Sequence, residues 1–349
     1  MPSESFEVFK RTKFFGSLDG LRALAIIAVI WHHMKSGPAD YAYFAWARHG
    51  VTMFFVLSGF LITTLLLREK EASGKIDLGK FYMRRTLRIF PVYYLVLLVY
   101  CLLVKFTEND LAAAERFWHN LPYFLTYTTN IFVPPSDPPR IIFYFAWSLA
   151  TEEQFYLVWP VTIKLLRAWA VPFLITLLTC RQIYLSMVEV GLFHDIVRSI
   201  SPAICIGALL AFLLNDERGF EGFSAIFSLA FVPAIMLALV CINLMFGFSD
   251  LLDGYWFALL TALLIGSCVI KEKHELSWFF GWPLIEKTGV LSYGMYLAHM
   301  IALNVIKKFM PDITLPFKFV ATLSLTFVVA WTLYYFYERP FLKLKERFR

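Results

Sequence analysis

Long runs of apolar residues recur along the chain, and short polar segments separate them. A helix needs about 20 mostly apolar residues to cross the hydrocarbon core of a bilayer. We place ten predicted spans on this pattern, at roughly 18–35, 51–67, 87–106, 144–166, 168–188, 197–214, 225–247, 254–270, 289–309 and 316–337. A shorter apolar piece at 121–133 lies in the longest loop, and we expect it to be re-entrant or interfacial. The pattern therefore predicts an all-α integral membrane protein, with about ten transmembrane helices in a single bundle and one domain over residues 1–349.

Composition and charge support this prediction and orient the bundle. Of the 349 residues, 59% are hydrophobic and only 17% are charged, whereas soluble domains carry about 25% charged residues. With a cytosolic N-terminus, the cytosolic segments hold 21 of the 32 Lys and Arg residues and the outer segments hold 10. Lys and Arg accumulate in the cytoplasmic loops of membrane proteins, so both termini are predicted to be cytosolic.

The first predicted span carries an arginine near its start and a histidine pair at its end. Arg22 and His33 are eleven residues apart, which on an α-helix leaves about 20° of rotation and about 16 Å of rise between them. They therefore share a face, while His32 lies about 80° to the side. Ionisable groups inside a membrane usually face the bundle interior and have a function. The alternative is that Arg22 extends to the membrane interface and the histidines only mark the far end of the span.

The densest positive charge lies between the second and third predicted spans. Arg84 and Arg88 are four residues apart and share a helix face, with Arg85 beside them. Planar guanidinium groups at this spacing can bind phosphate oxygens at the cytosolic membrane surface. The alternative is that these arginines are ordinary positive-inside residues that face lipid headgroups.

Two adjacent carboxylates, Glu152 and Glu153, lead into the fourth predicted span. The predicted topology places them toward the outer side, as it does His33. A carboxylate near a histidine can fix the tautomer of the ring and stabilise the imidazolium that forms when the ring takes a proton. Glu152 and Tyr156 are one turn apart on one face. The alternative is a helix N-terminus whose acidic residues favour the helix dipole.

Three further residues complete the candidates. Ser58 and Gly59 are small residues in a bulky predicted helix, which allows a neighbouring helix or a ligand to approach closely. His299 lies in the ninth predicted span. The histidines show no metal-ligand spacing, and the five cysteines stand singly beside apolar residues, so we expect no metal site and no nucleic-acid partner.

Six motifs follow one another along the chain. They are Asp19-Gly20-Leu21-Arg22 with the later His33; Phe54-Phe55-Val56-Leu57-Ser58-Gly59-Phe60-Leu61; Arg84-Arg85-x-x-Arg88-Ile89-x-Pro91; Trp147-Ser148-Leu149-x-x-Glu152 with Phe155-Tyr156; Ser292-Tyr293-x-x-Tyr296-Leu297-x-His299; and Glu338-Arg339-Pro340. Together they resemble the membrane acyltransferase-3 family, whose members acylate sugars and related acceptors across bacterial inner membranes. The resemblance covers about residues 15 to 342.

The resemblance implies a ten-helix bundle, multi-pass in the bacterial inner membrane. It implies an acyl-CoA donor, by default acetyl-CoA, that binds from the cytosol, and an acceptor hydroxyl on the periplasmic side. His33 is then the expected catalyst, Glu152 its partner, and Arg84, Arg85 and Arg88 the contacts to the donor phosphates, with Arg22 in either group. The residues expected to line the active site are Asp19, Ser58, Tyr156 and His299.

The function expected on these grounds is O-acyl transfer to a carbohydrate, a glycolipid or a secreted metabolite, in contact with membrane lipid and with no permanently bound cofactor. Two mechanisms are possible for His33: it acts as a general base, or it carries the acyl group as a covalent intermediate. The alternative class is a proton-coupled transporter or flippase in which Arg22, His33 and Glu152 form a relay; a third is a non-catalytic assembly subunit. Some members of the family carry a periplasmic SGNH-type hydrolase domain after the last helix, and because the sequence stops at Arg349 we expect none here.

Overall fold

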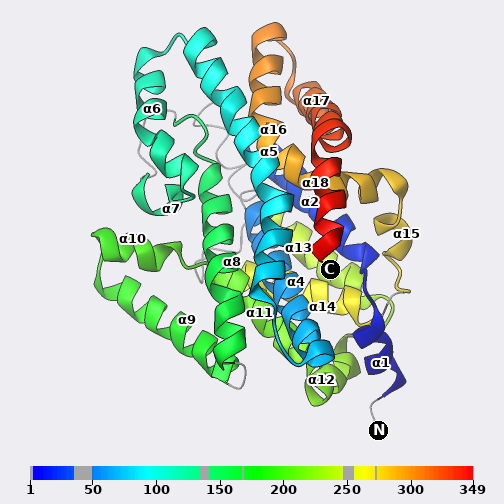
Figure 1. Ribbon diagram of the computed structural model, residues 1–349. Helices are drawn as coiled ribbons and strands as arrows, with labels where there is room; N and C mark the ends of the chain where they lie inside the picture. The colour runs from blue at the N-terminus through cyan, green and yellow to red at the C-terminus, as the bar shows by residue number, and fades with distance from the viewer. Residues whose placement is uncertain are drawn as a thin grey trace. The chain divides into compact units, whose positions relative to one another are not determined.

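The computed structural model describes residues 3–34, 49–133, 141–166, 169–246, 255–271 and 273–348, and every regular element in these ranges is a helix (Figure 1). The helices fall into two compact units, Met1–Arg68 with Pro202–Phe336, and Glu69–Ser201 with Tyr337–Arg349.

The first unit holds most of α4 and ten other elements. Their bounds are α1 Glu4–Arg11, α2 Gly16–His32, α4 His49–Ser73, α11 Pro202–Asn215, α12 Glu217–Phe227, α13 Val232–Phe246, α14 Tyr255–Val269, α15 Ser277–Phe280, α16 Pro283–Phe309, α17 Leu315–Leu333 and most of the π-helical turn η5 Tyr334–Glu338. The second unit holds α5 Leu78–Thr107, α6 Leu111–Leu125, α7 Thr129–Phe132, α8 Ala146–Leu166, α9 Ala170–Met187, α10 Leu192–Ser199, α18 Arg339–Lys345 and the 3-10 turn η6 Glu346–Phe348.

Each of the ten stretches predicted to span the membrane contains a helix, and the all-helical membrane fold is confirmed. In the described ranges, six helices are long and apolar enough to cross a bilayer, and the number rises to eight if each of two bent helix pairs is one span. The bends are 62° between α1 and α2 and 80° between α12 and α13. The total of ten spans and the cytosolic termini stay predictions.

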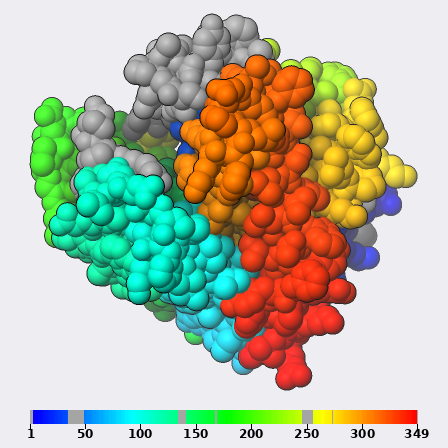
Figure 2. All heavy atoms as spheres, turned by 90° about the horizontal axis from the view of Figure 1, so that it is seen from above, coloured from blue at the N-terminus to red at the C-terminus, as the bar shows by residue number. Residues whose placement is uncertain are grey.

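The first unit is built on the contact of α2 with α16. A Cβ atom added at Gly289 would lie 1.9 Å from the Asp19 carbonyl oxygen, so the two backbones touch. At Gly20, an added Cβ would lie 2.3 Å from the ring of Phe280. Only glycine allows such an approach. On its other side α16 packs along α17, which lies beside it in Figures 1 and 2.

A second close crossing joins α4 to α11. A Cβ at Gly59 would lie 2.0 Å from the Ile204 carbonyl oxygen, and one at Gly207 would lie 2.1 Å from the Val56 carbonyl oxygen. The predicted close helix approach at Gly59 is therefore confirmed, with a glycine on each partner helix.

In the second unit, the segment predicted as re-entrant turns back along α5. Tyr93 Oη donates a hydrogen bond to the Phe124 carbonyl oxygen at 2.7 Å, and Tyr94 Oη donates one to the Leu125 carbonyl oxygen at 2.9 Å. Tyr93 lies about 22 Å from the start of α5, roughly halfway along this helix. The end of α6 therefore reaches the middle of α5 before α7 turns toward α8.

We expect Gly289→Ala to lower the midpoint of thermal unfolding in detergent, because the new methyl group must displace the α2 backbone, at a cost of about 1–3 kcal/mol. Gly294→Ala on the same helix is the matched control, since its Cβ would meet Ala330 Cβ at an ordinary 3.4 Å. Equal midpoints for the two variants would contradict the backbone contact at Gly289.

Candidate functional site

His33 lies at the C-cap of α2, directly after the last helical residue. Its Nδ1 atom lies 2.8 Å from the Val29 carbonyl oxygen. A carbonyl oxygen can only accept, so Nδ1 carries a proton, and in the neutral ring the lone pair belongs to Nε2. The main chain of α2 thus sets the tautomer of the predicted catalyst.

A ring of α16 and a ring of α2 pack against this imidazole. The centroids of His33 and His299 are 4.8 Å apart, with the rings at 63°, and His32 lies edge-on to His33 at 5.2 Å. His299 Nδ1 donates to the carbonyl oxygen of Tyr296, whose own ring lies 5.5 Å from His299. The structure therefore brings two predicted residues, His33 and His299, into direct contact.

Asp19 and Arg22 form an ion pair near the other end of α2. The Asp19 side chain is 4% exposed and the Arg22 side chain 24% exposed. A buried carboxylate needs such a partner, so the described contact of Arg22 is within its own helix. Ser58, the other predicted residue of this unit, is half-buried beside the Gly59 crossing.

The start of α2 is fixed by a histidine that sequence reasoning assigned no role. His274 Nε2 lies 2.9 Å from Ser17 Oγ, and the ring is buried next to Phe280. Burial lowers the pKa of His274, because it penalises the charged form. His274 precedes α15 in a loop, and no spacing in the sequence indicates its contact.

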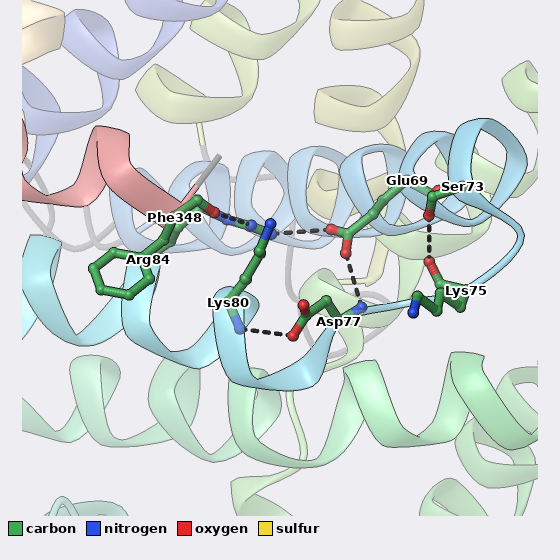
Figure 3. Close-up of polar contacts among 7 residues, drawn as sticks. All are labelled: Glu69, Ser73, Lys75, Asp77, Lys80, Arg84 and Phe348. Carbon is green, nitrogen blue, oxygen red and sulfur yellow. Dashed lines mark hydrogen bonds and ion pairs between the residues drawn. The ribbon is translucent and has the colours of Figure 1, made fainter.

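In the second unit, the three predicted arginines of α5 have different surroundings. Arg84 donates to Glu69 Oε2 at 2.9 Å and to the Phe348 carbonyl oxygen at 2.8 Å (Figure 3). The Arg85 guanidinium lies over the rings of Phe81 and Tyr156, with Cζ at 5.7 and 5.5 Å from their centroids. Within the described ranges, the buried Nε atom of Arg85 has no hydrogen-bond partner.

Glu152 and Tyr156 lie on α8 close to Arg85. Tyr156 Oη donates a hydrogen bond to Glu152 Oε1, as the spacing of one turn predicts. The charges of Glu152, Glu153 and Arg88 all act on the Arg85 guanidinium. The second unit thus holds a half-buried cluster of one arginine, two carboxylates and a tyrosine, which we call the α5–α8 cluster (Arg85, Glu152, Glu153, Tyr156).

A strained turn bonds to α8 at Gln154, the residue after Glu153 of this cluster. Tyr127 has a positive φ of 53°, which is unfavourable for a side chain of this size. Gln154 Nε2 donates to the Tyr127 carbonyl oxygen at 2.9 Å and also pairs with Asn130. Tyr127 stacks on Tyr93 at 4.3 Å. Sequence reasoning missed these three polar and aromatic contacts, because they depend on the turn of α6 and α7 back toward α8.

Arg88 lies one turn after Arg84, and its charge acts on the buried Glu338 carboxylate. Glu338 ends the π-helical turn η5, and such turns are frequent at functional sites. The signal for this residue was present in the sequence, as the closing Glu338-Arg339-Pro340 motif, although its position against Arg88 was not. No group of three or more potential metal-ligating side chains occurs in the part of the chain that the structure describes.

The predicted site residues therefore divide between the two units. His33, His299, Asp19, Arg22 and Ser58 belong to the first unit. The second unit holds Arg84, Arg85, Arg88, Glu152 and Tyr156. The predicted pairing of Glu152 with His33 joins residues of different units and stays a prediction.

Comparison with known proteins defines the class. The family described as "Acyltransferase domain" matches residues 15–335, and the chain belongs to this acyltransferase family. The resemblance drawn from the six motifs is thereby confirmed. No solved structure matches the chain.

Curated relatives are similar over nearly the whole chain. A Staphylococcus aureus protein provisionally named as an O-acetyltransferase is 29% identical over 98% of this chain and 59% of its own length. The peptidoglycan O-acetyltransferase of Listeria monocytogenes is 28% identical over 95% of this chain and 56% of its own length. The chain thus spans less than two thirds of the length of these relatives.

We expect the fold to lose stability as the pH falls below about 6.5, the ordinary pKa of histidine. Because the pKa of His274 is lowered in the folded state, the unfolded chain binds more protons in this range, and acid favours unfolding. Thermal unfolding measured from about pH 7.5 to about pH 5.5 tests this. His274→Gln keeps a donor toward Ser17 without a titrating ring, so its midpoint should fall less than that of the wild type. Parallel pH curves for the two proteins would contradict the role of His274.

Proposed function

We propose that this chain is a membrane O-acyltransferase that moves an acyl group, by default acetyl, from cytosolic acyl-CoA to a hydroxyl of a carbohydrate or glycoconjugate at the outer side of a bacterial inner membrane. The observation that carries the proposal is the orientation of His33, whose Nδ1 proton is held by Val29 and whose ring packs against His299. The family match gives the reaction class. The Listeria relative is named for peptidoglycan, which favours a sugar hydroxyl as the acceptor class.

The proposed reaction uses His33 Nε2 as a general base. The acceptor oxygen attacks the thioester carbonyl carbon while its proton passes to Nε2, the C–S bond breaks, and the proton then moves to the leaving thiolate to give free CoA. A lone pair at Nε2 is what this step requires, and the Val29 hydrogen bond supplies that tautomer. Transfer through an acylated His33 is the alternative chemistry.

The donor phosphates are proposed to meet Arg85 and Arg88 of α5. Arg85 supports this role best, because its buried Nε lacks a partner in the described ranges and an anion would supply one. Arg88 lies one turn further along α5. Arg22 and Arg84 are the other donor contacts expected from the sequence, and Asp19, Ser58 and Tyr156 are the expected lining residues. Ten spans and cytosolic termini are part of the same proposal.

Two helix directions support the topology that this mechanism requires. Asp19 meets Gly289 and His33 meets His299, so α2 and α16 run parallel, as the first and ninth of alternating spans do. Tyr82 Oη donates to the Leu157 carbonyl oxygen of α8. Further along α5, Tyr93 stacks on Tyr127, whose carbonyl oxygen accepts a hydrogen bond from Gln154, an earlier residue of α8. The helices α5 and α8 therefore run antiparallel, as a third and a fourth span do.

We expect purified protein in lipid to release CoA from acetyl-CoA and His33→Ala to abolish the release. Removal of a general base or nucleophile costs at least about 100-fold in rate. His32→Ala is the matched control, because His32 shares the environment but lies on another face, and it should retain most of the activity. Arg88→Ala should raise the KM for acetyl-CoA more than it lowers kcat.

If the His33→Ala variant released CoA at the wild-type rate, His33 would have no role in catalysis. The transporter hypothesis would replace the acyltransferase proposal under two conditions. The wild-type protein would neither bind nor turn over acetyl-CoA, and a proton gradient would drive solute movement that depends on His33. The measurement is thiol release with a chromogenic reagent, with solute flux in proteoliposomes as its counterpart.

A further inference from the structure

Arg84 differs from the other two arginines of α5 because two of its nitrogens already have partners. Its Nη2 atom pairs with Glu69 Oε2 at 2.9 Å, and both side chains are 23% exposed. Its Nη1 atom donates to the Phe348 carbonyl oxygen at 2.8 Å. Both are charge-assisted hydrogen bonds, which are stronger than neutral ones.

Glu69 itself is held in place by the main chain. Its second oxygen, Oε1, accepts a hydrogen bond from the Asp77 backbone N–H at 2.9 Å. Asp77 caps α5, because its side chain accepts from the Lys80 backbone N–H at 3.0 Å. Figure 3 shows these contacts as one chain of bonds that runs from the Lys80 backbone through Asp77, Glu69 and Arg84 to Phe348. The carboxylate is therefore a fixed acceptor, and Arg84 joins the start of α5 to the C-terminal turn.

The C-terminal segment meets α5 at a second point. The helix α18 packs against α5, and the buried Glu338 that precedes it lies within the electrostatic reach of Arg88. Phe348 at one end of this segment binds Arg84, and Glu338 at the other end faces Arg88. Displacement of the turn at Phe348 would therefore disturb the surroundings of Arg88.

We propose that Arg84 is a positioning residue of the donor site, which holds the C-terminal turn in place and so keeps Arg88 oriented, rather than a ligand of the donor phosphates. This assignment rests on the proposed function. It assigns Arg84 to the fold and keeps Arg85 and Arg88 as the proposed contacts to the donor phosphates.

The test compares Arg84→Gln and Glu69→Gln, with acetyl-CoA and acetyl-pantetheine as donors. We define the latch as the contacts of Arg84 with Glu69 and Phe348. Arg84→Gln removes both contacts, and Glu69→Gln removes the charge that holds the guanidinium in place. Both variants should therefore raise the KM for acetyl-CoA about fivefold, which corresponds to about 1 kcal/mol, and leave kcat unchanged. Acetyl-pantetheine lacks the nucleotide and its phosphates, so its KM should not move. Lys80→Gln is the matched control, because it removes an exposed cation nearby while its backbone bond to Asp77 persists.

The second measurement is the rate of amide hydrogen exchange in residues 339–348. Arg84→Gln and Glu69→Gln should both speed exchange in this segment, whereas Arg88→Gln should raise the KM for acetyl-CoA without speeding it. The proposal is overturned if Glu69→Gln lowers the KM or leaves it unchanged while Arg84→Gln raises it, because a direct phosphate ligand would behave in this way. It is also overturned if both donors are affected equally, which a general loosening of the fold would cause.

The two proposals fail in different ways. If the wild-type protein does not turn over acetyl-CoA, the proposed function fails, and exchange in residues 339–348 still shows whether the latch exists. If His33→Ala abolishes turnover but hydrogen exchange in residues 339–348 is the same in all variants, the proposed role of Arg84 is wrong and the proposed function stands.

Discussion

At Gly289 the backbone of α16 lies against the carbonyl of Asp19, and the histidine site depends on this contact. Helices are stiff, so a fixed point near the start of α2 also determines where its end lies. His33 lies fourteen residues, about 21 Å, beyond Asp19, and His299 lies ten residues, about 15 Å, beyond Gly289. The two imidazoles meet because the helices run parallel and close from that point on. Asp19 is buried at the contact, and Arg22 neutralises it from the same helix, so the crossing is not opened by an unpaired charge.

The features that depend on a single helix were predicted well from the sequence. Apolar runs located all ten helical stretches, the small residue Gly59 located a crossing, and a spacing of one turn located the Tyr156–Glu152 bond. It did not predict the break between α12 and α13 or the contact of His274 with Ser17. Hydrophobic periodicity reports which residues are buried along one element, whereas these features arise where distant segments meet. His33 and His299 were each predicted, but their contact follows only from the tertiary fold.

The arginines of α5 also show that helical spacing does not predict contacts between distant segments. Helical spacing places Arg84 and Arg88 on one face and assigns them one role. In the fold, Arg84 binds Glu69 and the C-terminal turn, while Arg85 lies over two aromatic rings. A guanidinium group can bind a carboxylate or a phosphate with both arms of its fork, and it can also donate to a carbonyl oxygen. Which of these it meets is decided by residues that lie up to 264 positions away in the chain.

The contacts of His33 also limit the number of functions that a carboxylate partner would need to perform. A carboxylate beside a catalytic histidine has two functions, to fix the tautomer and to stabilise the imidazolium. Here the Val29 carbonyl already performs the first, from within the same helix. A carboxylate partner, which the sequence predicts to be Glu152, would therefore be needed only for the second. Its described partner, Tyr156, lies beneath Arg85, so the charge of Glu152 also acts on an arginine proposed to bind the donor. Glu152 therefore acts on Arg85 whether or not it is also the predicted partner of His33, so loss of its charge is expected to weaken donor binding.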